Sequence, residues 1–100
     1  MNKRKLNKIK RLIESMRSRI ANIRSEELIS LAHQLGRERS QRGKEPTYES
    51  TLLPKRAPIS IPNHPGSLNK FTAGSILDDL EKDVFDIEES LEEEGEKKNA

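Results

Sequence analysis

The segment that decides the fold is residues 59–77, ISIPNHPGSLNKFTAGSIL, in which a strand pattern is followed by a loop and then by a helix pattern. Ile59 and Ile61 alternate with polar residues, as expected for the inward face of a half-buried strand. Proline, asparagine and glycine are frequent in residues 62–67 and indicate a loop. Thr72 is predicted to cap the helix that follows.

That last helix carries apolar residues at steps of 4, 3, 4, 3 and 4, which form a heptad seam on an acidic surface. The seam consists of Ala73, Leu77, Leu80, Val84, Ile87 and Leu91. A second seam, with steps of 3, 4, 3, 4 and 3, predicts a basic helix over residues 3–23. It consists of Leu6, Ile9, Ile13, Met16, Ile20 and Ile23. We expect the two helices to pack side by side, within one chain or across a dimer.

Shorter elements lie between the two seams. Residues 26–35 are predicted to form a short amphipathic helix, with Ser25 as its N-cap and Gly36 as its stop. Residues 37–42, 47–53 and 57–61 are predicted strands with short connections, which favours an antiparallel meander. The expected fold class is therefore α+β.

Length and charge indicate one small domain with an extension at each end. A chain of 100 residues is long enough for one core and too short for two. We expect a basic amphipathic helix at residues 1–24, the domain with its extended last helix at 25–91, and a disordered acidic tail at 92–100. Residues 1–56 hold 15 Lys/Arg and 6 Asp/Glu, a balance of +9, whereas the remainder holds 4 and 11, a balance of −7. This asymmetry indicates either a polyanionic partner or attraction between the two halves.

Several classes of protein are excluded by what the sequence lacks. There is no cysteine, so disulfides and thiolate metal sites are absent, as in a reducing compartment. The two histidines do not have the spacing of metal ligands, and we expect neither a metal nor a cofactor. No apolar run approaches the length of a membrane span, so we expect a cytoplasmic protein without a membrane partner.

Two stretches share residue types and spacing with a known family. The first comprises Glu27-Leu28, Gly36, Arg42-Gly43 and Tyr48. The second comprises residues 59–64, ending in Pro62-Asn63-His64, and then Leu68, Thr72 and Ile76-Leu77. Across residues 23–83 the chain thus resembles the HicA toxins of bacterial toxin–antitoxin systems, in which the corresponding segments read R-G-S-H-x-x-Y and V-P-x-H … L … T-x-x-x-I-L.

The resemblance implies a double-stranded-RNA-binding-like α-β-β-β-α core. It also implies an RNase that cuts mRNA and is neutralised by a partner antitoxin, HicB. The catalytic histidine of that family is the one in G-S-H. In this chain Lys44 stands in place of the serine and Glu45 in place of the histidine, so the departure falls on the catalytic position.

Metal-independent RNA cleavage needs a base for the 2′-hydroxyl proton and an acid for the leaving oxygen. Glu45 is a candidate base; the alternatives are an exposed glutamate in a turn and a contact to HicB or another protein. His64, which matches the histidine of P-x-H, is a candidate proton donor or phosphate ligand; the alternative is a histidine that fixes the loop. Whether the chain is an enzyme stays open at this point.

A basic cluster in the predicted strands is the expected RNA-binding surface, because Lys and Arg bind phosphates independently of sequence. It consists of Arg37, Arg39, Arg42, Lys44, Lys55 and Arg56, with Tyr48 as the one tyrosine. The alternative is a solvated basic edge that prevents pairing with other strands. The expected function is a HicA-like toxin that binds mRNA, and the alternative is a non-catalytic RNA-binding or protein-interaction module.

Overall fold

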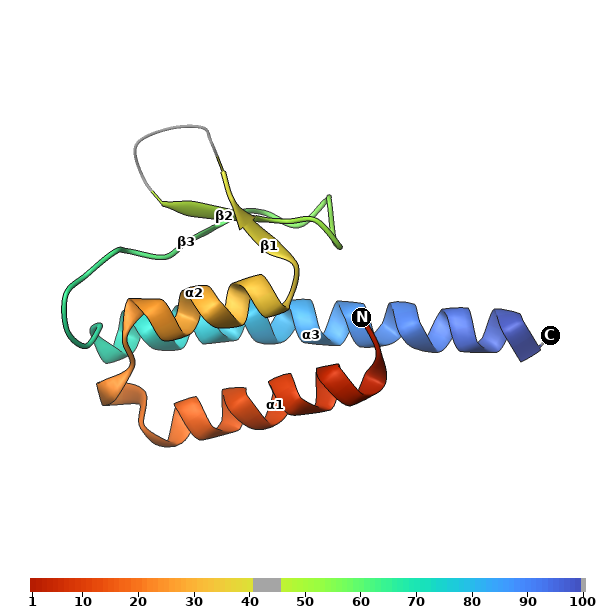
Figure 1. Cartoon of the computed structure of the whole chain (residues 1–100), viewed down its shortest axis with the longest axis horizontal. Helices are drawn as coiled ribbons and strands as arrows, with labels where there is room; N and C mark the ends of the chain where they lie inside the picture. The colour runs from red at the N-terminus through yellow and green to blue at the C-terminus, as the bar shows by residue number, and fades with distance from the viewer. Residues whose placement is uncertain (41–45, 100) are drawn as a thin grey trace.

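The computed structural model describes residues 1–40 and 46–99, with side chains as far as Glu93 (Figure 1). Within these residues the chain forms three α-helices, one short 3-10 helix and one antiparallel sheet of strand order β1-β2-β3, which confirms the α+β class. The elements in chain order are α1 (Lys3–Ser18), η1 (Ile20–Asn22), α2 (Ser25–Gln34), β1 (Arg37–Arg39), β2 (Thr47–Ser50), β3 (Ile59–Ser60) and α3 (Lys70–Asn99).

The long helix α3 is the element against which the others pack. Figure 1 shows α1 running antiparallel along one side of α3, α2 lying over α3, and the sheet on the side away from α1. Both predicted seams face one hydrophobic core, in which their residues are buried except for Ile20 and Leu91, which are partly buried against it. The predicted pairing of the basic and acidic helices is thus formed within a single chain.

Ion pairs between α1 and α3 fix their alignment. Lys10 pairs with Glu88, and Arg17 Nη2 donates to Asp78 Oδ1 at 2.8 Å. Because each pair joins a cation of α1 to an acid of α3, part of the charge asymmetry of the sequence is neutralised inside the molecule. The lower-numbered end of α1 lies beside the far part of α3, where Met1, Ser90 and Leu91 line a common hollow.

The helix starts differ from the sequence expectation in two places. The N-cap position of α2 is Arg24 rather than Ser25, because the hydroxyl of Ser25 accepts the N–H of His64 at 3.1 Å and is buried there. The last helix begins at Lys70, before Thr72, because the side chain of Asn69 accepts the N–H of Phe71 at 2.8 Å. The sequence predicts a disordered tail from residue 92, whereas α3 continues to Asn99.

The turn from α2 into β1 requires glycine, as predicted for Gly36. Its φ of +83° lies in the left-handed region, and a Cβ there would stand 2.8 Å from Cγ of Leu52. The carbonyl of Gly36 accepts the N–H of Thr51 at 2.9 Å, next to the β1–β2 pairing of Arg37 with Ser50. The sheet therefore starts directly at the end of α2.

An ion pair holds the connection between α1 and α2. Nη1 and Nη2 of Arg19 donate to the two carboxylate oxygens of Glu27 at 3.1 and 2.6 Å. Glu27 also accepts the backbone N–H of Arg24 at 2.9 Å. The hydrogen bonds from Arg19, followed by the one from Arg24, lower the pKa of Glu27 below its usual value because they favour the charged carboxylate.

Replacing Glu27 with glutamine should destabilise the fold in a pH-dependent way. A carboxylate whose pKa is lower in the folded chain stabilises that chain above its unfolded-state pKa, and the contribution is lost as the pH falls through its folded-state pKa. Urea denaturation should show Glu27→Gln to be less stable than wild type at neutral pH, with a difference that shrinks in acid. Glu89→Gln, at an exposed position of α3, is the control. A difference of constant size across the acid range would contradict this assignment.

Candidate functional site

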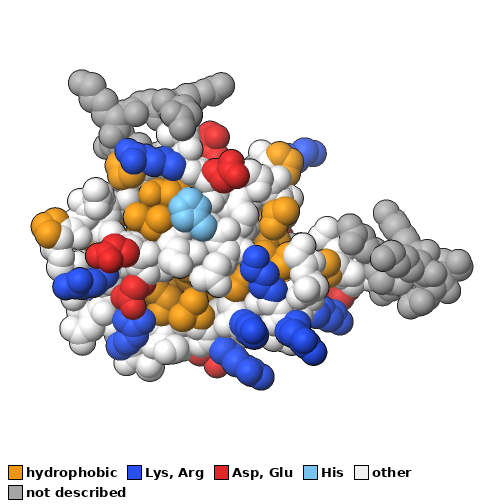
Figure 2. All heavy atoms as spheres, in the orientation of Figure 1, with side chains coloured by type: hydrophobic (Ala, Val, Ile, Leu, Met, Phe, Trp, Pro, Cys, Tyr) orange, Lys and Arg blue, Asp and Glu red, His pale blue; other side chains and the backbone are white. Residues whose placement is uncertain are grey.

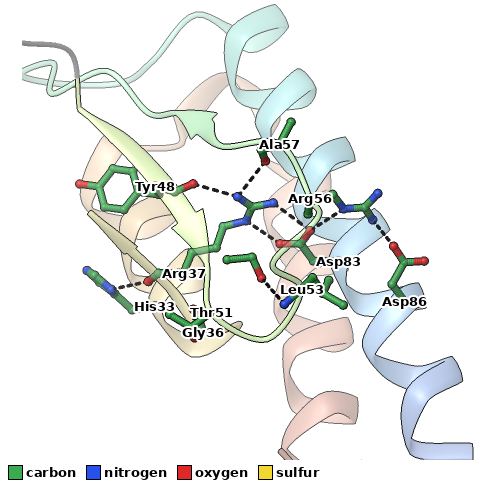
Figure 3. Close-up of polar contacts among 11 residues, drawn as sticks. His33, Gly36, Arg37, Tyr48, Thr51, Leu53, Arg56, Ala57, Asp83 and Asp86 are labelled. Atoms are coloured by element: carbon green, nitrogen blue, oxygen red, sulfur yellow. Dashed lines mark hydrogen bonds and ion pairs between the residues drawn. The ribbon is translucent and has the colours of Figure 1, made fainter. Parts of the chain in front are cut away.

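Arg37, a member of the predicted RNA-binding cluster, is buried in a clamp with Asp83 (Figure 3). The side chains of Arg37 and Asp83 are only 1% and 0% exposed. Nε of Arg37 donates to Oδ2 of Asp83 at 2.6 Å, and Nη2 donates to Oδ1 at 3.0 Å. This bidentate geometry is the strongest form of arginine–carboxylate pairing and joins the first residue of β1 to the middle of α3.

The remaining guanidinium nitrogen of Arg37 binds backbone. Nη1 donates to the carbonyl of Tyr48 at 2.8 Å and to the carbonyl of Ala57 at 3.2 Å. Arginine has five N–H donors, and four hydrogen bonds within the protein leave little capacity for a ligand. The expectation that Arg37 faces RNA is therefore wrong, because its side chain points into the core and holds β2 and the segment before β3 against α3.

Arg56 also pairs with acids of α3. Its Nε donates to Oδ1 of Asp83 at 3.1 Å, and its Nη2 lies 2.6 Å from Oδ2 of Asp86. The Arg56 side chain is 28% exposed and closes the clamp on the solvent side (Figure 3). The guanidiniums of Arg37 and Arg56 are balanced by the carboxylates of Asp83 and Asp86, so Arg56 is not a free phosphate ligand in this arrangement.

The sequence analysis did not identify Asp83 as the buried partner of Arg37. Its spacing along α3 could have revealed it, because Asp83 follows Ile76 by seven residues and so lies on the same face of the helix. An acid in line with Ile76 and Ile87, which are 4% and 5% exposed, must be buried and therefore needs a buried cation. The pattern of α3 could thus have indicated a buried acid that needs a cation, although not which arginine supplies it.

The rest of the predicted cluster has mixed positions. Arg39 and Lys55 are exposed, whereas Tyr48 is 4% exposed and packs in the core. The predicted positions at residues 41–45, which include Arg42, Lys44 and Glu45, lie outside the described residues. Of the basic residues predicted to bind RNA, Arg39 and Lys55 are therefore the ones that the structure places in solvent.

The two histidines are both on the surface, but they are held differently. His64 is tied through its backbone to the hydroxyl of Ser25, and its imidazole has no hydrogen-bond partner among the described residues. His33, near the end of α2, has Nδ1 at 3.0 Å from the carbonyl oxygen of Arg37 (Figure 3). Its ring meets Tyr48 edge-on, with 5.9 Å between centroids and an interplanar angle of 80°.

The outer surface of α1 carries the largest set of free cations in the described part of the chain. Lys10 and Arg17 pair with α3, and Arg19 pairs with Glu27. The others are exposed and form no ion pair with any described residue. These α1 cations are Lys3, Arg4, Lys5, Lys8 and Arg11. Figure 2 shows Lys and Arg side chains gathered over the N-terminal half of α1, where these residues lie.

Among the described residues there is neither a metal-binding group nor a membrane-spanning helix. No group of three or more His, Asp or Glu side chains there is placed to hold a metal ion. None of the helices in residues 1–40 and 46–99 combines the length and the apolar character that a membrane span needs.

Comparison with known proteins adds no relative to this description. The chain matches no protein-family model, no curated protein and no solved structure. The resemblance to HicA thus rests on the sequence stretches alone, and the ligand is inferred from the chemistry of the surface.

Removing the carboxylate of the clamp should unfold the chain more readily. Asp83→Ala leaves the guanidinium of Arg37 buried without its partner, a change that typically costs about 3–5 kcal/mol. Asp78→Ala, which removes an ion pair whose acid is 63% exposed, should cost less than about 1 kcal/mol. The free energy of unfolding in urea compares the two.

The double variant Arg37→Met with Asp83→Leu separates an unpaired charge from lost packing. It should recover much of the stability that Asp83→Ala loses, because no buried charge is left unpaired. Equal, small effects of Asp83→Ala and Asp78→Ala would show that the clamp contributes no more than a surface pair.

Proposed function

We propose that this chain binds RNA through the outer surface of α1, as a HicA-like protein of the toxin family. The observation that carries the proposal is that the α1 cations are exposed and unpaired among the described residues, whereas Arg37 and Arg56 are committed to α3. Cations held in a row on a rigid helix suit a phosphate backbone, whose charges are also in a row.

The geometry of α1 supports contact along a strand of RNA rather than at one point. Arg4, Lys8 and Arg11 are spaced by four and three residues and so form one stripe on α1. Neighbouring members of the stripe are about 4.5–6 Å apart along the helix axis. Exposed Arg39 and Lys55 lie with the sheet, on the side of α3 away from α1, and are therefore separate from this stripe.

The resemblance to HicA makes RNA the nucleic acid that we propose. The resemblance implies a double-stranded-RNA-binding-like core of order α-β-β-β-α, and α2, β1, β2, β3 and α3 follow one another in that order within an antiparallel α+β fold. Domains of that kind recognise RNA largely by shape and phosphate contacts, which suits a surface rich in cations and poor in exposed tyrosine. Here α1 is an additional element that carries the charge.

A protein partner is the second candidate, and two exposed aromatic side chains favour it. Phe71 and Phe85 are 74% and 58% exposed. They are separated by about four turns of α3 and therefore share a face. Exposed apolar side chains on one face suit a protein interface, and a HicB-like antitoxin is the protein partner that the HicA resemblance implies. A homodimer would use this face too, because the seams of α1 and α3 are already buried against each other.

Neutralising the stripe should weaken RNA binding and its salt dependence. Arg4→Ala, Lys8→Ala and Arg11→Ala together remove three exposed cations, and each lost phosphate contact should lower the salt slope by about one unit. Fluorescence anisotropy with a labelled mRNA fragment at several salt concentrations gives both quantities.

The matched control removes cations from another surface. Lys70→Ala with Lys82→Ala neutralises two exposed positions of α3 and should leave the slope close to that of wild type. A slope that is unchanged in the triple variant, or lowered equally per charge in the control, would contradict binding through α1.

Cleavage of mRNA is the activity that the resemblance adds, with Glu45 and His64 as the proposed catalytic groups. Induced expression of wild type, Glu45→Ala and His64→Ala, followed by mRNA integrity and growth, tests it. His64→Ala should abolish cleavage while RNA affinity is retained, because its exposed imidazole contributes no packing. Intact mRNA after expression of wild type would leave RNA binding without cleavage as the function.

A further inference from the structure

A shallow hollow of about 630 Å³ lies between α1 and α2. Its lining includes Lys5 from α1 and Ile29, Ser30, His33 and Gln34 from α2. Lys5 is one of the α1 cations, so the hollow adjoins the surface proposed to bind RNA. The hollow therefore places His33 at the edge of that surface.

His33 is held in one orientation with one nitrogen available. The carbonyl of Arg37 can only accept a hydrogen bond, so Nδ1 of His33, 3.0 Å away, carries the proton. In the neutral ring the lone pair is then on Nε2, which becomes an acceptor. Tyr48 supports the ring edge-on at 5.9 Å. The carbonyl itself is well positioned, because the side chain of the same residue is clamped by Asp83.

Lys5 has the position and charge to bind a phosphate. It lies in the first turn of α1, where the helix dipole favours an anion, and its backbone N–H is capped by the side chain of Asn2 at 2.9 Å. Its ammonium forms no ion pair with any residue in the described ranges. Arg4 and Lys8, the neighbouring exposed cations, extend the positive charge beyond the hollow.

The one acid in the lining is at the other end of the hollow. Glu26 precedes His33 by seven residues, which places it about 10 Å away along α2. Its side chain is 81% exposed and lies 4.0 Å from Nη1 of Arg24. Repulsion from Glu26 would direct a phosphate to the end formed by Lys5 and His33.

We propose that this hollow binds one ribose–phosphate unit of an RNA strand and distinguishes RNA from DNA. Lys5 binds the phosphate, and Nε2 of His33 accepts a hydrogen bond from the ribose 2′-hydroxyl. The 2′-hydroxyl is the group by which a protein tells RNA from DNA. The half-buried side chain of Ile29 provides an apolar surface for the sugar. This inference rests on the proposed RNA binding and specifies where on that surface the ribose is recognised.

The test compares the affinities of the full chain for two labelled single strands that differ only at the 2′ position. One is RNA and the other is DNA of the same sequence with deoxyuridine in place of thymidine. Wild type should bind the RNA about 2- to 10-fold more tightly, as expected for one net hydrogen bond. Lys5→Ala should weaken binding of both strands, because it removes a phosphate contact.

Two substitutions of His33 separate its two nitrogens. His33→Asn retains an N–H donor in place of Nδ1 but has no group at Nε2, so the ratio of the two affinities should fall to about one while DNA affinity is unchanged. His33→Gln carries its amide oxygen near the position of Nε2 and should retain part of the preference. Thermal denaturation of both variants verifies that they fold. If only one of them folds, its ratio of RNA to DNA affinity still tests the acceptor role of Nε2.

The outcomes distinguish the two proposals. Wild type that binds neither strand overturns RNA binding and this site together. Wild type that binds both strands equally, or a preference for RNA that survives in His33→Asn, overturns the ribose site and leaves binding through the α1 cations intact. A preference lost in His33→Asn and partly kept in His33→Gln supports it.

Discussion

The buried ion pair between Arg37 and Asp83 is the interaction on which the rest of the structure depends. The strands are only three, four and two residues long, and a sheet of that size is not stable by itself. The guanidinium joins α3 to the backbone of Tyr48 and Ala57 and so attaches the sheet to the helices. Since either charge alone would be buried without compensation, the two residues require each other.

The same pair determines which cations remain for a ligand. The basic first half of the chain divides into residues paired with acids, such as Lys10, Arg17 and Arg37, and residues left in solvent. The two halves attract each other through α1, α3 and the clamp, while the outer surface of α1 keeps a positive surplus. The proposed RNA surface is this surplus, displaced from the strands to the first helix.

Periodicity predicted the helices and their pairing, because the spacing of apolar residues is a local property of the chain. The residue type of Gly36 predicted where α2 stops, because glycine readily adopts the left-handed backbone that this position requires. The sequence pattern did not predict that Arg37 is buried, because a cation in a short strand is expected in solvent unless its buried partner is known. That partner is 46 residues away in the sequence, and the pairing follows from tertiary packing alone. Ser25 was misassigned as a cap for a similar reason, since its hydroxyl binds the distant backbone of His64.

The arginine Nε–H resonances of the full chain, recorded with and without RNA, test this division of the cations most directly. The Nε–H of Arg37, which donates to Asp83 at 2.6 Å, should exchange slowly with water and keep its chemical shift when RNA binds. The resonances of Arg4 and Arg11 should exchange rapidly and move on addition of RNA. An Arg37 resonance that exchanges as fast as that of Arg4 and shifts with RNA would contradict the account.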